Sequence, residues 1–342
     1  MNSRRHFIKS TGLLAAAGIL VPSETFAQIQ ISQKVKIKPR ALRAGDTVAI
    51  TSPAGAVWDE TQIETFSGIL KSFGFNVILG KTLTEKFGYF AGTDELRANE
   101  LNELFANKEV KGIFCMKGGW GCARLLDKIN YELIEKNPKV LIGFSDITTL
   151  LIAITVKTGL ITFHGPVGNS GWNDFTRSVF SNVVMTSKVF TFPENPITEN
   201  KPVMITPGNV TGALIGGNLT VITSIIGSGY LPDWKGKILF LEEVKEEPYS
   251  IDRMLTQLKL SGVLNSISGL VFGKCAKCLA EDPLKSFTFQ EVLIQHIQPL
   301  AIPAFYGAMI GHIENKLTLP LGVNASIDAA KGTISLNENA VT

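Results

Sequence analysis

In Lys139-Val-Leu-Ile-Gly-Phe-Ser-Asp-Ile-Thr-Thr149, an apolar run leads into one serine and then into a second apolar run. Val140 to Gly143 has the length and composition of a buried strand, and the residues after Ser145 continue as an apolar helix. The pattern predicts that Ser145 lies at a strand-to-helix turn, with its hydroxyl beside the free N–H groups of a helix start. That position is typical of a serine nucleophile. It also fits an ordinary helix N-cap, because Ser and Asp are preferred there.

Strand and helix signals alternate on both sides of this stretch. Apolar strands are predicted at 48–51, 75–79, 110–116 and 160–163, and helices at 61–73, 93–106 and 123–129. The alternation predicts an α/β fold whose N-terminal part is an open parallel sheet with flanking helices and right-handed crossovers.

The composition changes at 190–209, where four prolines stand among polar residues, and this segment is predicted to be a linker. It separates an N-terminal α/β domain, 40–189, from a C-terminal mixed α/β domain, 210–342. In the second domain, a loop and helix are predicted at 214–226, strands at 237–241, 267–272 and 304–310, helices at 251–260 and 289–297, and a hairpin at 317–336.

The first residues have the features of an export signal. Arg4-Arg5 precedes the apolar run from Gly12 to Val21, and Thr25-Phe26-Ala27 resembles a small-residue cleavage site. We therefore expect a twin-arginine signal over 1–27 and export, in a Gram-negative cell, to the periplasm. The apolar run is too short for a membrane span, so none is expected in the mature chain.

Net charge and cysteine content limit the function further. A formal net charge of +3 over 342 residues gives no reason to expect nucleic-acid binding. Cys275-Ala-Lys-Cys278 allows a disulfide, a redox pair or simply two small residues at a strand end. No second pair stands at zinc-ligand spacing, so no metal site is predicted.

A serine nucleophile needs a base, and the base needs an orienting carboxylate. His164, His296 and His312 are the histidines outside the signal. His164 and His312 both follow apolar strands, where catalytic groups of such sheets collect, whereas His296 lies on a predicted helix.

The carboxylate could come from an acidic run. Glu242 and Glu243 end the predicted strand at 237–241, and Glu246 lies in the loop that follows. A solvated acidic surface is the alternative explanation of this run.

Gly118-Gly119-Trp120-Gly121 follows the third predicted strand and offers an unencumbered backbone near Ser145. Backbone amides of such a loop can hold an oxyanion. No Walker pattern is present, because the lysine precedes the glycines.

Six motifs now occur together and in order, and together they resemble the serine LD-carboxypeptidases, the muramoyl-tetrapeptide carboxypeptidase family that includes microcin C self-immunity peptidases. The likeness spans Val48 to the C-terminus. The motifs are Lys117-Gly-Gly-Trp-Gly-Cys-Ala-Arg-Leu-Leu-Asp127, Gly143-Phe-Ser-Asp-Ile-Thr148, Phe163-His-Gly-Pro166, Leu241-Glu-Glu243, Pro248-Tyr-Ser-Ile-Asp-Arg253 and Gly311-His312.

The resemblance implies a triad at the interface of two domains, without metal or organic cofactor. Ser145 would be the nucleophile, His312 the base, and Glu242 the orienting carboxylate, with Glu243 and Glu246 as neighbouring alternatives. The backbone amides of Gly119 and Asp146 would form the oxyanion hole.

The implied substrate is a murein tetrapeptide that loses its terminal D-alanine. Arg124 and Arg253 are candidates for binding the terminal carboxylate of that substrate, although each also fits a surface or ion-pair role. Ser250 stands where the family often has arginine, which puts a substrate contact from that position in question. The likeness also suggests a homodimer.

Three other functions remain open. The triad could instead hydrolyse aminoacyl or peptidyl nucleotides, as in the immunity branch. A non-catalytic periplasmic binding protein would explain the architecture and the export but not the triad. A thiol oxidoreductase built on Cys275 and Cys278 would lack a thioredoxin-like context.

Overall fold

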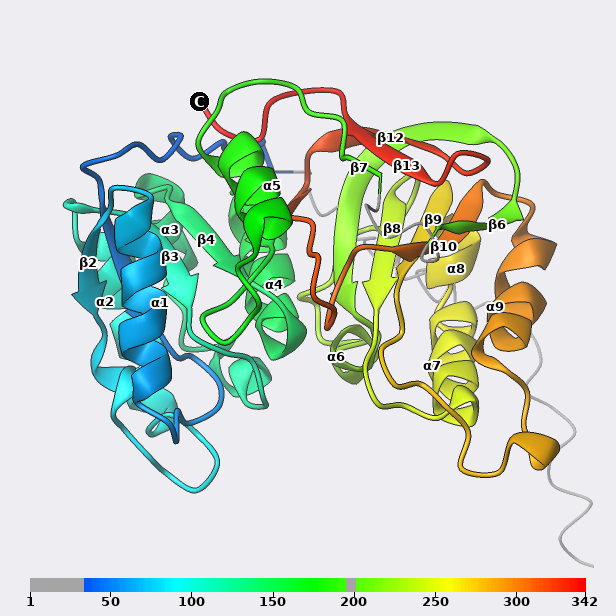
Figure 1. Cartoon of the computed structure of the whole chain (residues 1–342), viewed down its shortest axis with the longest axis horizontal. Coiled ribbons are helices and arrows are strands. Elements are labelled where there is room, and N and C mark those ends of the chain that lie inside the picture. Colours follow the sequence, from blue (N-terminus) through cyan, green and yellow to red (C-terminus); the bar gives the residue numbers. More distant parts are fainter. Residues whose placement is uncertain (1–33, 195–200) are drawn as a thin grey trace, which may run out of the picture. The chain divides into compact units, whose positions relative to one another are not determined.

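The computed structural model describes residues 34–194 and 201–342 (Figure 1). The predicted signal, 1–27, lies outside the described residues, as do 195–200 of the predicted linker. None of the helices in the described ranges combines the length and the apolar character that crossing a membrane would need.

The first sheet contains the stretch around Ser145. Its strands lie in the order β11-β5-β4-β3-β1-β2, and β1 to β5 are parallel, whereas β11 is antiparallel to β5. Strand β4 is buried along its whole length, which explains its uninterrupted apolar sequence. The strands are β1 (Thr47–Thr51), β2 (Asn76–Leu79), β3 (Val110–Cys115), β4 (Val140–Gly143), β5 (Thr162–His164) and β11 (Leu319–Leu321).

Helices connect these parallel strands, as the alternating pattern predicts. The helix expected at 123–129 is wrong: a short 3-10 helix, η2, stands there, and α3 begins only after Asn130, whose side chain caps it. The helical elements are α1 (Thr61–Ser72), η1 (Lys81–Leu83), α2 (Asp94–Ala106), η2 (Cys122–Leu125), α3 (Tyr131–Lys136), η3 (Ser145–Ile147), α4 (Thr148–Thr158) and α5 (Asp174–Val184).

The second sheet has the order β13-β12-β7-β8-β9-β10-β6, and its β7, β8, β9 and β10 are parallel. The parallel core brings the carboxyl ends of β8 and β10 to one edge. Its elements are β6 (Val203–Thr206), β7 (Asn209–Asn218), α6 (Leu219–Ser224), β8 (Ile238–Glu242), α7 (Pro248–Leu260), α8 (Val263–Ser266), β9 (Gly269–Gly273), η5 (Pro283–Lys285), α9 (Phe289–Ile297), η6 (Gln298–Leu300), β10 (Ala304–Ala308), β12 (Asn324–Asp328) and β13 (Thr333–Leu336).

In the segment expected to be a loop and helix, 214–226, the first part is the end of strand β7, whereas the expected helix is present as α6. The glycines at the end of β7 allow close packing. A Cβ on Gly216 would overlap the carbonyl oxygen of Phe240 on β8, and one on Gly217 would overlap Thr148 of α4. The backbone can approach its neighbours this closely only with glycine.

The hairpin predicted at 317–336 is present only in the second part of that segment. Strands β12 and β13 form an antiparallel hairpin, whereas β11, just before them, pairs with β5 of the first sheet. Strand β6, from within the predicted linker, pairs with β10 of the second sheet. The division into domains 40–189 and 210–342 remains a proposal.

The two sheets meet through the end of β7 and the start of α4. The Asn218 amide donates to Thr148 Oγ1 at 3.1 Å. Since α4 begins three residues after Ser145, this contact brings the carboxyl end of β4 to the edge of the second sheet.

Candidate active site

Ser145 occupies a strained turn between β4 and α4. Its φ is 63°, in the left-handed region that residues other than glycine seldom adopt. Ser145 is not an N-cap residue, because Phe144 and Ile147 occupy the N-cap positions that precede η3 and α4, and neither helix start has a side-chain cap. The geometry is that of a nucleophile elbow and not that of a helix N-cap.

The glycine loop after β3 lies directly against this turn. A Cβ on Gly118 would come within 2.8 Å of Ser145 Cβ and 3.2 Å of the Asp146 nitrogen. Gly119 and Gly121 have φ values of 122° and 123°, which side chains would oppose. Glycine is therefore needed for the loop to place its backbone beside the serine.

Two buried side chains fix this loop. Asp146 Oδ2 accepts a hydrogen bond from the Cys122 amide at 2.8 Å, and burial raises the pKa of Asp146. Arg97, fully buried, donates to the carbonyl oxygens of Pro53 at 2.6 Å and Gly121 at 3.2 Å. The loop is thus tied both to the elbow and to the end of β1.

Sequence reasoning missed Arg97, although a signal existed. Arg97 stands at helical spacing from Leu101 and Leu104, so it lies on the apolar face of α2. A charged residue on a buried face needs partners, and here they are loop carbonyls and Asp94.

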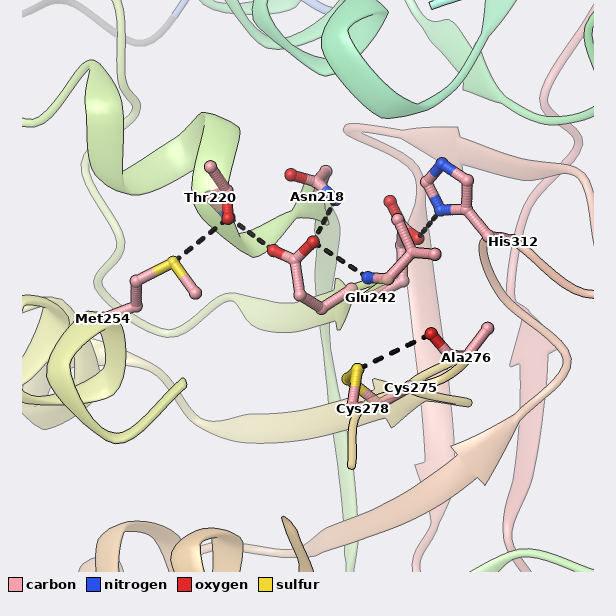
Figure 2. Close-up of a disulfide and its surroundings, with 10 residues drawn as sticks. Asn218, Thr220, Glu242, Met254, Cys275, Ala276, Cys278 and His312 are labelled. Carbon is pink, nitrogen blue, oxygen red and sulfur yellow. Dashed lines mark hydrogen bonds and ion pairs between the residues drawn. A yellow bond between two sulfur atoms is a disulfide. The ribbon is translucent and has the colours of Figure 1, made fainter. Parts of the chain in front are cut away.

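The second sheet supplies a histidine–carboxylate pair. His312 Nδ1 lies 2.8 Å from Glu242 Oε2, and Glu242 is completely buried at the end of β8 (Figure 2). Burial alone would raise the pKa of Glu242, but the hydrogen bond and the charge of His312 hold this pKa below its usual value. A Cβ on Gly311 would overlap Glu242 Oε2, so glycine is needed beside this histidine.

Phe144 connects the serine turn to this pair. Its ring centroid lies 4.8 Å from that of His312, and Phe144 directly precedes Ser145. The structure therefore brings Ser145, Glu242 and His312 into one region. In the described part of the chain, no hydrogen bond joins Ser145 Oγ to His312.

The other two histidines lie outside this pair. His164 is buried between Phe144 and Phe240 with both ring nitrogens unpartnered, and burial lowers its pKa to about 4. His296 Nε2 lies 2.7 Å from Asp252. Neither is paired with Glu242.

The neighbouring acids have different surroundings. Glu243 accepts from Asn218 Nδ2 at 3.1 Å and from the amides of Thr220 and Val244, and burial raises its pKa. Glu246 is half-buried and makes no hydrogen bond to His312. Of the three acids, only Glu242 reaches the histidine.

The candidate arginines have other partners than the Glu242–His312 pair. Arg124 Nε donates to Asp94 at 2.8 Å, and its guanidinium lies 4.9 Å from the Phe90 ring centroid. Arg253 is exposed on α7 beside Tyr249. Neither forms a hydrogen bond or ion pair with Ser145, Glu242 or His312, all of which are described.

Cys275 and Cys278 form a disulfide, one of the arrangements that their spacing allows (Figure 2). Between them, the Ala276 amide donates to the Glu243 carbonyl at 3.2 Å, and the Ala276 carbonyl accepts from the Lys245 amide at 2.9 Å. The disulfide loop thus supports the chain just after Glu242. Within 34–194 and 201–342, no three His, Cys, Asp or Glu side chains are grouped as metal ligands.

Comparison with known proteins places this geometry in a family. Residues 48–165 match the LD-carboxypeptidase N-terminal domain, and residues 211–327 match the LD-carboxypeptidase C-terminal domain. The "Probable murein peptide carboxypeptidase" of Bacillus subtilis (strain 168) is 38% identical over 303 residues, which cover 86% of this chain and 93% of the relative.

Solved structures agree with the fold. The microcin C7 self-immunity protein in complex with aspartyl sulfamoyl adenosine has a TM-score of 0.82 at 30% identity, over 90% of this chain and all of the other. Muramoyltetrapeptide carboxypeptidase from Oxalobacter formigenes has a TM-score of 0.75 at 31% identity, over 85% of this chain and 97% of the other. With both domains matched in order, the chain belongs to the LD-carboxypeptidase family of serine-peptidase-type hydrolases.

Proposed function

We propose that the protein is a serine LD-carboxypeptidase that removes the terminal D-alanine from murein tetrapeptides. The observation that carries the proposal is the buried Glu242–His312 pair beside the strained Ser145 turn. Relatives named for murein peptides support the substrate class.

The proposed reaction begins with proton transfer. Because Nδ1 of His312 is engaged by Glu242, Nε2 is the nitrogen that takes the Ser145 proton. The serine oxygen then attacks the carbonyl of the residue before D-alanine. Catalytic hydrogen bonds often tighten only in the substrate complex, so the Ser145–His312 bond would form at this stage.

The resulting oxyanion would be held by the backbone amides of Asp146 and Gly119, which the close approach of Gly118 to Ser145 brings together. One such donor is worth about 3–4 kcal/mol in comparable sites. His312 would next protonate the leaving nitrogen of D-alanine, and water would release the acyl-enzyme by the same steps in reverse.

Several features of the proposal rest on sequence and family likeness alone. Arg124 or Arg253 would bind the terminal carboxylate of the substrate, and Arg124 would have to exchange Asp94 for it. Removal of residues 1–27, a periplasmic location and a homodimer complete the proposal.

An aminoacyl nucleotide is the second candidate substrate. The observation in its favour is the similar structure of the microcin C7 self-immunity protein, which was solved with aspartyl sulfamoyl adenosine. The same triad would cleave the bond to the aminoacyl group.

The test is release of D-alanine from a purified murein tetrapeptide, followed by mass spectrometry, with the wild type and Ser145→Ala side by side. We expect one alanine to be lost with the wild type only. If folded wild type releases none but hydrolyses an aminoacyl sulfamoyl adenosine, the second candidate replaces the first.

A further inference from the structure

Lys316 is a buried lysine beside the candidate active site. It is 6% exposed and follows His312 in the segment between β10 and β11. Its Nζ lies 5.8 Å from the centroid of the Phe144 ring, and the His312 ring centroid lies 4.8 Å from the same point. Because Phe144 directly precedes Ser145, the ammonium group and the histidine lie around a ring that adjoins the nucleophile.

The ammonium group of Lys316 has few partners for a buried charge. Its Nζ donates to the carbonyl oxygen of Ile313, the residue after His312. Among the residues that the structure describes, it forms no ion pair. An ammonium group carries three N–H donors, and burying a charge is costly unless the charge is paired and hydrogen-bonded. Lys316 therefore has donors to offer to an anion.

Two carboxylates act on Lys316 without direct contact. Burial lowers the pKa of Lys316, whereas the charges of Glu242 and Glu314 oppose this shift. Glu242 is already engaged by His312, and Glu314 is exposed, so water weakens the effect of its charge. Neither carboxylate forms an ion pair with the ammonium group, which can therefore still attract an anion.

The backbone around Lys316 is held by α5 and by the chain after β10. The Lys316 amide donates to Thr176 Oγ1 on α5 at 3.1 Å. The Leu317 amide donates to the carbonyl oxygen of Met309 at 2.8 Å. Because these bonds fix the backbone that carries the lysine, little ordering is needed when its side chain binds a ligand.

Lys139 shows how another buried lysine of this chain is satisfied. It is also 6% exposed, but its Nζ donates to two carbonyl oxygens, those of Asn107 and Val110, both at 2.7 Å. It directly precedes β4, whereas Ser145 follows the other end of that strand. Lys139 therefore stabilises the fold, and it offers a comparison for the role of Lys316.

We propose that Lys316 binds the terminal carboxylate of the peptide substrate. This inference rests on the proposed function, since it names the residue that recognises the cleaved end of that substrate. In the proposed reaction, His312 protonates the nitrogen of the leaving D-alanine. The carboxylate of the same D-alanine lies within about 4 Å of that nitrogen, so it must lie on the histidine side of the nucleophile. Lys316 places its charge on that side.

The two arginines considered for this role are less suited to it. Arg124 is engaged by Asp94 at 2.8 Å, and Arg253 is exposed on α7. Lys316, in contrast, donates to the residue next to His312 and needs no exchange of an ion-pair partner to accept a carboxylate. The lysine therefore takes the place of both arginines in this assignment.

The test uses two tetrapeptides that differ only in their last group, which is D-alanine in one and D-alaninamide in the other. The amide keeps the scissile bond and the size of the substrate but lacks the negative charge. For the wild type, we expect kcat/KM to be about 10–100-fold higher for the acid, as for one charged hydrogen bond. Lys316→Met keeps an unbranched side chain without the charge, and it should bring this ratio down to about one.

Lys139→Met is the matched control, because it removes an equally buried ammonium group at the other end of β4. It should keep the wild-type ratio, whatever its effect on the free energy of unfolding. If Lys316 has a structural role only, Lys316→Met lowers kcat/KM for both peptides equally, and the unchanged ratio would overturn the inference. A ratio that falls with Arg124→Gln or Arg253→Gln but not with Lys316→Met would also overturn it.

A binding measurement separates this inference from the proposed function. Isothermal titration calorimetry follows the acid and the amide peptide with Ser145→Ala and with Ser145→Ala/Lys316→Met. Tighter binding of the acid that depends on Lys316 supports the carboxylate site even if the wild type cleaves neither peptide. Equal affinities for the two peptides in Ser145→Ala, or no binding of the acid, would overturn it. That comparison needs no variant of Lys316, so it decides the matter even if Lys316→Met fails to fold.

Discussion

Replacing Glu242 by glutamine keeps the volume of the side chain and an oxygen acceptor but removes the charge. In the proposed reaction, His312 becomes positively charged as it takes the serine proton. With Nδ1 and Oε2 2.8 Å apart, the two charge centres lie about 4 Å from each other. At an effective dielectric constant of about 20, their attraction is about 4 kcal/mol.

This energy is available only when the histidine is charged, so its loss raises the barrier. Glu242→Gln should lower kcat by about 10³, since each 1.36 kcal/mol corresponds to a factor of ten. KM should change little, because Glu242 is fully buried and does not reach the substrate.

The assay is the initial rate of D-alanine release by the purified variants, with circular dichroism and urea unfolding to confirm the fold. Glu243→Gln is the matched control: it alters the neighbouring buried acid, whose contacts are with Asn218 and with backbone amides. We expect that variant to lose stability but to keep kcat within tenfold.

Two results would refute the reasoning. A folded Glu242→Gln enzyme with kcat within tenfold of wild type would mean that no buried charge stabilises the histidine. A collapse of kcat in Glu243→Gln alone would identify the other acid as the orienting group.

Three further predictions concern the surroundings of the site. Gly118→Ala should lower kcat by about 10² with the fold intact, because its Cβ would lie 2.8 Å from Ser145 Cβ and displace an oxyanion donor. For His164, the folded pKa of about 4 lies below the unfolded value of 6.5, so the unfolded chain binds the proton first and stability falls as pH drops through this window. The contribution lost between pH 7 and pH 5 is about 2 kcal/mol, and urea unfolding of His164→Phe should show an acid dependence weaker by that amount. Replacing Cys275 and Cys278 together by serine should lower the free energy of unfolding by about 2 kcal/mol, the entropy of closing so short a loop.

For each of these predictions, a specific result would contradict the reasoning. Gly68→Ala adds a Cβ with no atom within 4 Å, so an equal loss of kcat there would contradict the steric argument. His296→Gln leaves the buried imidazole of His164 in place. If this variant weakens the acid dependence of stability as much as His164→Phe does, the assignment of that dependence to His164 is wrong. If the double serine variant has the same free energy of unfolding as the wild type, the disulfide restricts the unfolded chain little.

The sequence by itself was enough for the α/β class, the parallel first sheet and the turn that holds Ser145. These features are local: an apolar run of strand length, a glycine or a cap is recorded in neighbouring residues. The order of motifs also identified the family, which the domain matches then confirmed. Local pattern missed the end of β7, because the glycines there serve packing against β8 and α4, which neighbouring residues do not record.

Only the tertiary structure decided which distant groups meet. It paired His312 with Glu242, 70 residues away, left His164 unpaired in the core, and joined β11 to a sheet formed mainly by the first half of the chain. It also placed Arg97 beneath the glycine loop. Such contacts depend on the order of the strands in each sheet and on which side chains are buried away from water. Spacing along the chain carries neither. The family likeness implied the Glu242–His312 pair, whereas the isolation of His164, the place of β11 and the role of Arg97 became visible only in the fold.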